Sequence, residues 1–174
     1  MVTTILLVSG STRAGSANTA ALRTARGVAD VDCVLFDGLT ALPAFVPDGA
    51  APPEPVAALL SQIDGADAVL FCTPEYAGTL PGSLKNLLDW TVGGGQLAGK
   101  PVAWVNVAPP GRGDGAVATL ALVLGYVGAH VVEGACVRVP VARESVGPDG
   151  LIVDPAVREG LRGVLGVLTE AAAA

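Results

Sequence analysis

Residues 4–27 read TILLVSGSTRAGSANTAALRTARG, and this stretch decides the fold class. Its first part, residues 4–9, is a short aliphatic run of the kind found in strands that are covered on both faces. A turn with Gly10, Gly15 and several small polar residues follows. An alanine- and leucine-rich segment of helical composition then runs from Ser16 to Gly27. A buried strand, a turn and a helix in this order form the first unit of an α/β fold.

The same pattern recurs along the chain. Short apolar runs alternate with longer segments of helical composition, and glycine and proline separate them. We expect strands at residues 4–9, 31–36, 68–73, 102–107 and 129–139, and helices at residues 16–27, 54–63, 82–90, 115–126 and 155–170. These units predict a doubly wound parallel sheet of five strands in the order 2-1-3-4-5, with helices on both faces, in a single domain over residues 1–174.

The composition supports a globular chain of this class. The 174 residues are 51% hydrophobic and 15% charged, which excludes a disordered polar chain. The longest nearly unbroken apolar stretch, residues 116–129, is shorter than the roughly 18–20 residues that span a bilayer. The first residues lack the basic and long apolar regions of a secretory signal, so we expect a cytoplasmic protein.

Charge and residue counts exclude several kinds of chemistry. The formal net charge of −6 argues against general binding of nucleic acid or anionic lipid, so an anionic ligand would need a local binding device. Cys33, Cys72 and Cys136 are widely separated within apolar runs, as buried hydrophobic residues are. His130 is the one histidine, which leaves no histidine triad or His-rich metal site. We therefore expect neither a metal nor a nucleophile with its base.

Function is expected where the strands end. In an open parallel sheet, ligands bind outside the carboxyl ends of the strands, where the winding direction reverses. Three loops that follow strands have unusual compositions, namely residues 10–16, 74–81 and 108–114. The order 2-1-3-4-5 makes their strands neighbours, so these loops should meet at one end of the sheet. Residues 37–55, rich in proline and glycine, are expected to form a surface or dimer-contact excursion.

The first loop combines hydroxyl groups, a guanidinium and flexible backbone at the start of a helix. Such a site suits a phosphate, because the N–H groups of a helix N-terminus lack internal partners and Arg13 can donate charge-assisted hydrogen bonds. The residues are equally compatible with a simpler interpretation, in which Ser16 caps the helix and Arg13 is a solvated loop charge. The loop matches neither the Walker A pattern nor G-x-G-x-x-G.

The second loop, residues 73–82, contains two prolines, two glycines and Tyr76. Its backbone groups could bind the edge of a flat heteroaromatic ligand while Tyr76 contacts the ring face. Taken alone, the segment favours a plain turn in which Tyr76 covers the end of the sheet.

Together the two loops carry a resemblance that neither carries singly. The pattern G-S-T-R-x-x-S-x-N from Gly10 and the pattern P-E-Y-x-x-x-x-P-G-x-L-K-N-x-x-D-W from Pro74 resemble the NADPH-dependent FMN reductase family. That family consists of flavodoxin-like enzymes and includes quinone, azo-dye and chromate reductases. The resemblance extends from the first strand to about His130, and beyond that only the order of elements is similar.

The resemblance implies roles for residues of all three loops. The first loop would hold the FMN phosphate, the second would line the isoalloxazine ring, and two residues of the third would be its neighbours. These residues are Ser11, Arg13, Ser16, Ala17 and Asn18, then Pro74, Glu75, Tyr76, Ala77 and Gly78, and finally Ala108 and Gly111. Ala77 departs from the asparagine that many relatives carry, which leaves recognition there to the backbone. Lys85, Asn86, Asp89 and Trp90 would serve packing and dimer contact.

The implied function is an FMN-dependent NAD(P)H oxidoreductase. FMN would take a hydride from NADPH or NADH and pass the reducing equivalents to a flavin, quinone or other small oxidant, in a ping-pong cycle. The resemblance also suggests a homodimer, with a homotetramer as the alternative.

Two other functions stay open on the sequence. One is a flavodoxin-type electron carrier that binds FMN without oxidising nicotinamide nucleotides. The other is a dinucleotide-binding regulatory module, because residues 111–116 fit G-x-G-x-x-A and open a predicted helix. The position of that pattern counts against the second alternative, since such a fingerprint belongs to the first strand–helix turn of a fold.

Overall fold

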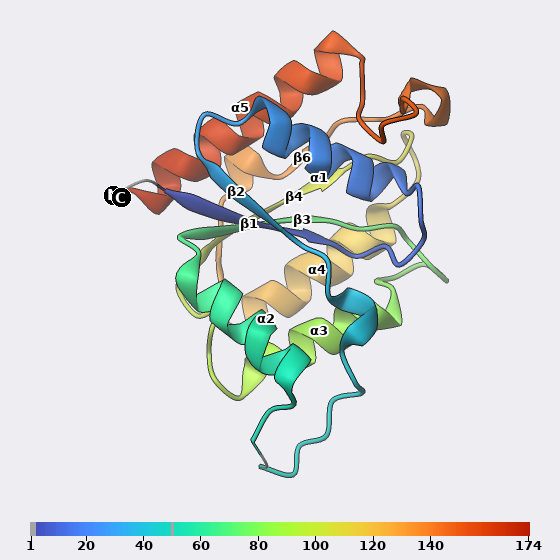
Figure 1. Cartoon of the computed structure of the whole chain (residues 1–174). Coiled ribbons are helices and arrows are strands. Elements are labelled where there is room, and N and C mark those ends of the chain that lie inside the picture. The colour runs from blue at the N-terminus through green and yellow to red at the C-terminus, as the bar shows by residue number, and fades with distance from the viewer. Residues whose placement is uncertain (1–2, 50) are drawn as a thin grey trace.

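A parallel β-sheet forms the centre of the computed structural model, which describes residues 3–49 and 51–174 (Figure 1). Its strands are β1 (Thr4–Ser9), β2 (Asp32–Phe36), β3 (Ala68–Cys72), β4 (Pro101–Asn106), β5 (His130–Val131) and β6 (Val137–Arg138). The order is β2-β1-β3-β4-β5, with β6 also paired to β4, and the strand pairs are parallel. The predicted strand order is therefore confirmed.

Helices cover both faces of the sheet. They are α1 (Ala17–Val28), α2 (Glu54–Gly65), α3 (Gly82–Val92), α4 (Asp114–Tyr126) and α5 (Pro155–Ala172). Figure 1 shows α1 and α5 on one face and α2, α3 and α4 on the other, which confirms the doubly wound arrangement. Within the described residues, no helix is long and apolar enough to cross a membrane.

The two faces of β1 explain its continuous apolar sequence. Ile5 and Leu7 belong to the hydrophobic cluster under α1 and α5, whereas Leu6 and Val8 belong to the cluster under α2, α3 and α4. All four side chains are buried. Because successive side chains of a strand point to opposite faces, a strand covered on both sides needs apolar residues at every position.

The prediction of one continuous strand at residues 129–139 is wrong. Residues 129–139 form β5, a 3-10 turn at Glu133–Ala135 and then β6. The turn falls where the apolar run is interrupted by a charge and a glycine, and it buries Ala135 in the core under α5. As a result β6 pairs with the carboxyl end of β4, where the register joins Arg138 to Asn106.

The excursion after β2 is held by α3. The amide of Asn86 accepts from the N–H of Phe45 at 2.8 Å and donates to the carbonyl oxygen of Pro43 at 2.9 Å. The indole N–H of Trp90 donates to the same oxygen at 3.0 Å, and the Phe45 and Trp90 rings meet edge to face at 4.9 Å. The packing role expected for Asn86 and Trp90 is confirmed, and their dimer contact stays a prediction.

Candidate functional site

Three loops meet at the carboxyl end of the sheet. They follow β1, β3 and β4, and the strand pairings place these three strands side by side. The expectation that the first, second and third loops share one end of the sheet is therefore confirmed. All the predicted site residues lie on these loops or at the first turn of α1.

Gly10 brings the first loop against the second. Its N–H donates to the carbonyl oxygen of Cys72 at 2.9 Å. A Cβ at this position would lie 2.2 Å from Oγ1 of Thr73 and 2.9 Å from Cδ2 of Leu84, closer than side-chain atoms can approach. The first loop can pass Thr73 only because residue 10 has no side chain.

Ser16 and Asn18 shape the start of α1. The Ser16 hydroxyl accepts from the backbone N–H of Asn18 at 3.2 Å, and both side chains are buried. The carboxamide oxygen of Asn18 accepts from the Cys72 thiol at 3.4 Å. The helix-capping interpretation of Ser16 is thus confirmed, and its contact with a phosphate stays a prediction.

Arg13 has the charge and the exposure that a residue needs to bind a phosphate group. Its guanidinium is exposed, and no ion pair joins it to any residue in the described part of the chain. The Ser11 hydroxyl accepts from the backbone N–H of Arg13 at 3.3 Å. An anion at this loop would meet a guanidinium, hydroxyl groups and the positive end of the α1 dipole.

The second loop turns in a left-handed conformation. The backbone N–H groups and carbonyl oxygens of Tyr76 and Thr79 exchange two hydrogen bonds, of 3.0 and 3.1 Å. Between them Ala77 has φ of +52° and Gly78 has φ of +77°. Asparagine and glycine adopt this region far more readily than alanine, for which it costs roughly 1 kcal/mol. The left-handed backbone at Ala77 therefore explains why many relatives carry asparagine at this position. Tyr76 is 52% exposed and available to a ligand.

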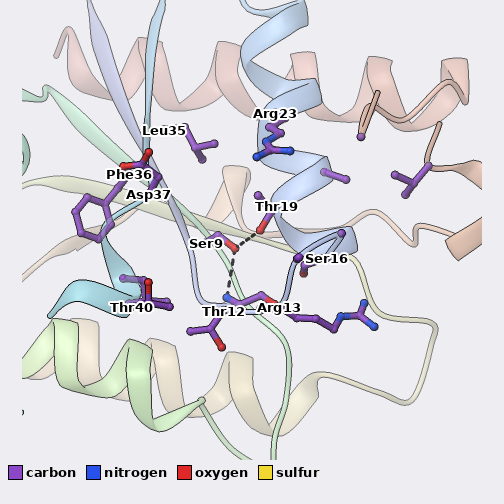
Figure 2. A pocket seen from close by; sticks show the side chains of 17 residues that line it. Ser9, Thr12, Arg13, Ser16, Thr19, Arg23, Leu35, Phe36, Asp37 and Thr40 are labelled. Carbon is purple, nitrogen blue, oxygen red and sulfur yellow. Dashed lines mark hydrogen bonds between the residues drawn. The ribbon is translucent and has the colours of Figure 1, made fainter. Parts of the chain in front are cut away.

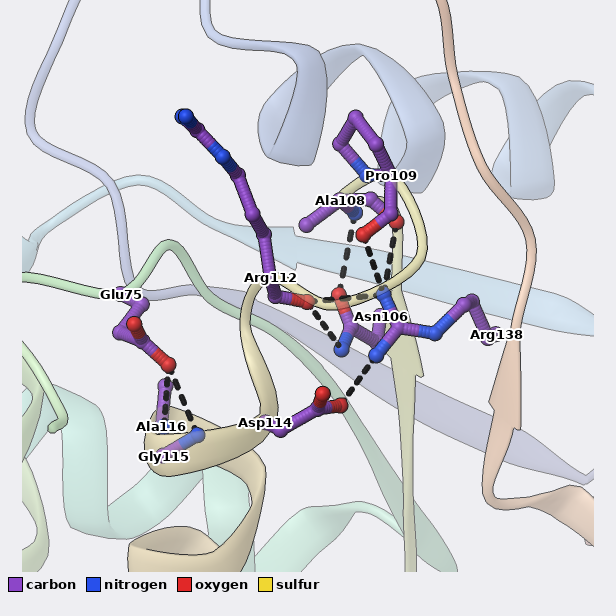
Figure 3. A network of polar contacts seen from close by, with 9 residues as sticks. All are labelled: Glu75, Asn106, Ala108, Pro109, Arg112, Asp114, Gly115, Ala116 and Arg138. Carbon is purple, nitrogen blue, oxygen red and sulfur yellow. Dashed lines mark hydrogen bonds and ion pairs between the residues drawn. The ribbon is translucent and has the colours of Figure 1, made fainter. Parts of the chain in front are cut away.

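Glu75 ties the second loop to α4, as Figure 3 shows. Its Oε2 accepts from the backbone N–H of Gly115 at 2.7 Å and of Ala116 at 3.3 Å. A carboxylate at a helix N-terminus satisfies free N–H groups and opposes the helix dipole favourably. At the same contact, a Cβ on Gly115 would lie 2.1 Å from the carbonyl oxygen of Gly78. The loops after β3 and β4 thus pack as one unit.

This contact also bears on the G-x-G-x-x-A pattern. A dinucleotide fingerprint binds a pyrophosphate with the free N–H groups that begin its helix. At α4 two of these groups, from Gly115 and Ala116, already donate to Glu75. The structure therefore counts against a pyrophosphate site at residues 111–116.

Arg138 holds the third loop. Its Nη1 donates to the carbonyl oxygens of Ala108, Pro109 and Arg112 at 2.8, 2.9 and 2.8 Å, and its Nη2 pairs with the carboxylate of Asp114 (Figure 3). One guanidinium therefore binds three main-chain groups of the loop and the first residue of α4.

Sequence reasoning missed Arg138 and Asn106 as residues of this site. Asn106 is 6% exposed, and its side-chain oxygen accepts from the N–H of Ala108 at 3.0 Å. For Arg138 a signal existed, because it is a charge inside the apolar run 129–139, and a half-buried charge needs partners. The sequence does not say which partners those are.

The thiols do not offer a nucleophile at neutral pH. Burial, and to a lesser extent the charge of Asp32, raises the pKa of Cys33 to about 11. Burial also raises the pKa of Cys72 and of Cys136. Among residues 3–49 and 51–174, no cluster of three or more His, Cys, Asp or Glu side chains could hold a metal ion.

Comparisons with known proteins agree on the family of this site. The model of the NADPH-dependent FMN reductase family matches residues 3–144. An NAD(P)H-dependent FMN reductase of Pseudomonas aeruginosa is 34% identical over 163 residues, which cover 89% of this chain and 87% of that protein. A probable NADPH:quinone oxidoreductase of Oryza sativa is 27% identical over 171 residues, covering 92% of this chain and 84% of that protein.

A solved structure extends the likeness to the whole chain. FerB, a flavoenzyme NAD(P)H:(acceptor) oxidoreductase from Paracoccus denitrificans, superimposes with a TM-score of 0.86 at 28% identity. The match covers 99% of this chain and 98% of that protein, so it includes the last third, where the sequence motifs end.

Proposed function

The chain belongs to the NADPH-dependent FMN reductase family, and from this premise we propose that it is an FMN-dependent oxidoreductase that transfers reducing equivalents from NAD(P)H to a flavin, a quinone or another small oxidant. One observation supports this proposal above the others. The loops after β1, β3 and β4 meet at one end of the sheet, with the exposed Arg13 guanidinium on the first loop and an exposed turn on the second.

The residues present fit FMN. Arg13 and the N-terminus of α1 supply local positive charge in a chain whose net charge is −6, and this is what a phosphate needs. Gly10 has no side chain, so the first loop can pass close to Thr73 of the second loop. Tyr76, Ala77 and Gly78 present exposed backbone and one aromatic ring to a flat ligand, and Ala108 and Gly111 add small residues from the third loop.

The chain's own residues then hold and orient the cofactor. Bound FMN supplies the redox chemistry, because a flavin accepts a hydride from a reduced nicotinamide and returns reducing equivalents to an oxidised acceptor. Arg13 binds the phosphate and sets its position. Glu75 and Arg138 hold the second and third loops in fixed positions relative to α4. Burial raises the pKa of all three thiols, so the role that we propose for the chain is binding and orientation of the cofactor.

The proposal predicts a flavin spectrum that NAD(P)H bleaches. Purified protein reconstituted with FMN should show visible flavin absorption that disappears when NADPH or NADH is added without oxygen. Both substrates would react with the same bound flavin, so we expect them to bind in turn and to give parallel lines in double-reciprocal plots.

Two results would contradict the proposal in different ways. A bound flavin that neither NADPH nor NADH reduces would make the chain a flavodoxin-type carrier. Absence of any flavin spectrum after reconstitution would exclude the FMN site itself.

The outer face of α4 supports a homodimer. Its sequence, DGAVATLALVLGY, has one charged residue, and helices that are apolar all round are normally covered. Leu122 is 62% exposed and Tyr126 is 87% exposed, and the two are one turn apart on the same side. We propose that a second copy of the chain covers this face, in a dimer or a tetramer.

Charges on this face should separate the subunits. Leu122→Glu combined with Tyr126→Glu is expected to convert the assembly to monomers, because carboxylates would be buried without partners. Light scattering on a sizing column measures the mass. Val153→Glu is the control, since Val153 is 67% exposed and lies outside α4. A wild-type monomer, or a double variant of unchanged mass, would contradict this interface.

A further inference from the structure

A cavity of about 290 Å³ adjoins the first loop and extends away from the loops predicted for the flavin ring. Residues 11–16 form one wall, and residues 35–37 with Leu39 and Thr40, at the end of β2, form another. Thr19 and Arg23 of α1 line it as well, as do Val146 and Gly150 from the segment before α5. None of residues 74–78, 108 and 111 lines it, so the cavity is not the ring site.

Arg23 of α1 and Asp37 at the end of β2 face this cavity with unmatched charges, and Arg13 of the first loop adds a second cation. Figure 2 shows Arg23 and Asp37 on different walls of the cavity. Both are exposed, and no ion pair joins either of them to another of the described residues. Nη1 of Arg23 lies 3.4 Å from the position that a Cβ of Gly150 would take, so the guanidinium reaches the segment before α5. A cation and a carboxylate that face one cavity without pairing are free to bind two different groups of one ligand.

The remaining lining suits a nucleoside. Leu35 and Val146 supply half-buried apolar surface, and Thr12 and Thr40 supply exposed hydroxyl groups. In nucleotide-binding sheets, an acidic residue after the second strand accepts from the ribose hydroxyls, which is the position of Asp37. A guanidinium binds phosphate oxygens, and apolar surface accommodates a base.

We propose that this cavity binds the adenosine phosphate part of a dinucleotide. Arg23 binds phosphate oxygens and Asp37 accepts from the ribose diol. Two dinucleotides share this chemistry, namely FAD bound in place of FMN, and NAD(P)H bound beside FMN. The inference rests on the proposed function, because that function places the flavin phosphate at the first loop.

Titrations distinguish the two sources. If the source is FAD, apo-protein binds FAD about tenfold more tightly than FMN, and Arg23→Ala abolishes the difference without changing the FMN dissociation constant. If the source is NAD(P)H, FMN-loaded protein binds ADP-ribose, and Arg23→Ala weakens this binding about tenfold. Asp37→Ala should weaken the binding of the same ligand whose binding Arg23→Ala weakens. Arg26→Ala is the control, since Arg26 is exposed on the same helix and does not line the cavity.

Two results would overturn the inference. One is that FAD binds no more tightly than FMN and ADP-ribose does not bind the loaded protein. The other is that the binding survives both Arg23→Ala and Asp37→Ala unchanged. Failure of FMN itself to bind would instead contradict the proposed function, so the two failures are distinguishable.

Discussion

Gly115→Ala is expected to destabilise the folded protein and to weaken FMN binding. The added Cβ would lie 2.1 Å from the carbonyl oxygen of Gly78 and 3.0 Å from Oε2 of Glu75, so the second loop and the start of α4 must move apart. Overpacking of this kind costs about 1–3 kcal/mol, which lowers the Tm of a chain of this size by roughly 2–12 °C. Displacement of the turn at Gly78 should weaken FMN binding about tenfold, the equivalent of about 1.4 kcal/mol.

A second glycine provides the matched control. Gly163 lies inside α5, and a Cβ there would meet no atom within 4 Å. Gly163→Ala is therefore expected to stabilise the protein by about 0.5–1 kcal/mol, since alanine loses less conformational freedom in a helix. Thermal unfolding and flavin fluorescence titration measure the two effects. A Gly115→Ala protein with the Tm and the FMN affinity of the wild type would show that the second loop does not depend on this contact.

Arg13→Ala is expected to raise the FMN dissociation constant about 10- to 100-fold. Hydrogen bonds to charged groups contribute about 1.5–3 kcal/mol, and Arg13 is the exposed cation of the predicted phosphate loop. The folded state should keep its stability, because no ion pair of Arg13 with the described residues is lost. The FMN dissociation constant of Arg13→Lys should lie between those of the wild type and Arg13→Ala, since an ammonium keeps the charge without the planar fork of a guanidinium.

Riboflavin separates this effect from general damage to the site. It lacks the phosphate, so its affinity should be the same for the wild type and for Arg13→Ala. Arg26→Ala is the charge-matched control, because Arg26 is an exposed residue in the last turn of α1. An unchanged FMN dissociation constant in Arg13→Ala would mean that the phosphate binds elsewhere.

The fold could be predicted from the sequence because its signals are local. The apolar run at residues 4–9 predicts a strand buried on both faces, and Ile5 and Leu6 do pack against opposite helix layers. The division of residues 129–139 into β5 and β6 was not predicted. Glu133 and Gly134 interrupt the apolar pattern there, and in the structure they form a 3-10 turn that buries Ala135.

For the site, the sequence by itself determined which loops come together and which residue types they present. It did so because strand order brings the carboxyl ends of β1, β3 and β4 together whatever the side chains do. Only the tertiary structure decided where the charged side chains point. Glu75 binds α4 at a residue 40 positions away, and Arg138 binds a carbonyl oxygen 30 positions away. Such contacts depend on the packing of distant segments, which fixes the direction of a side chain and which no local pattern of residues encodes.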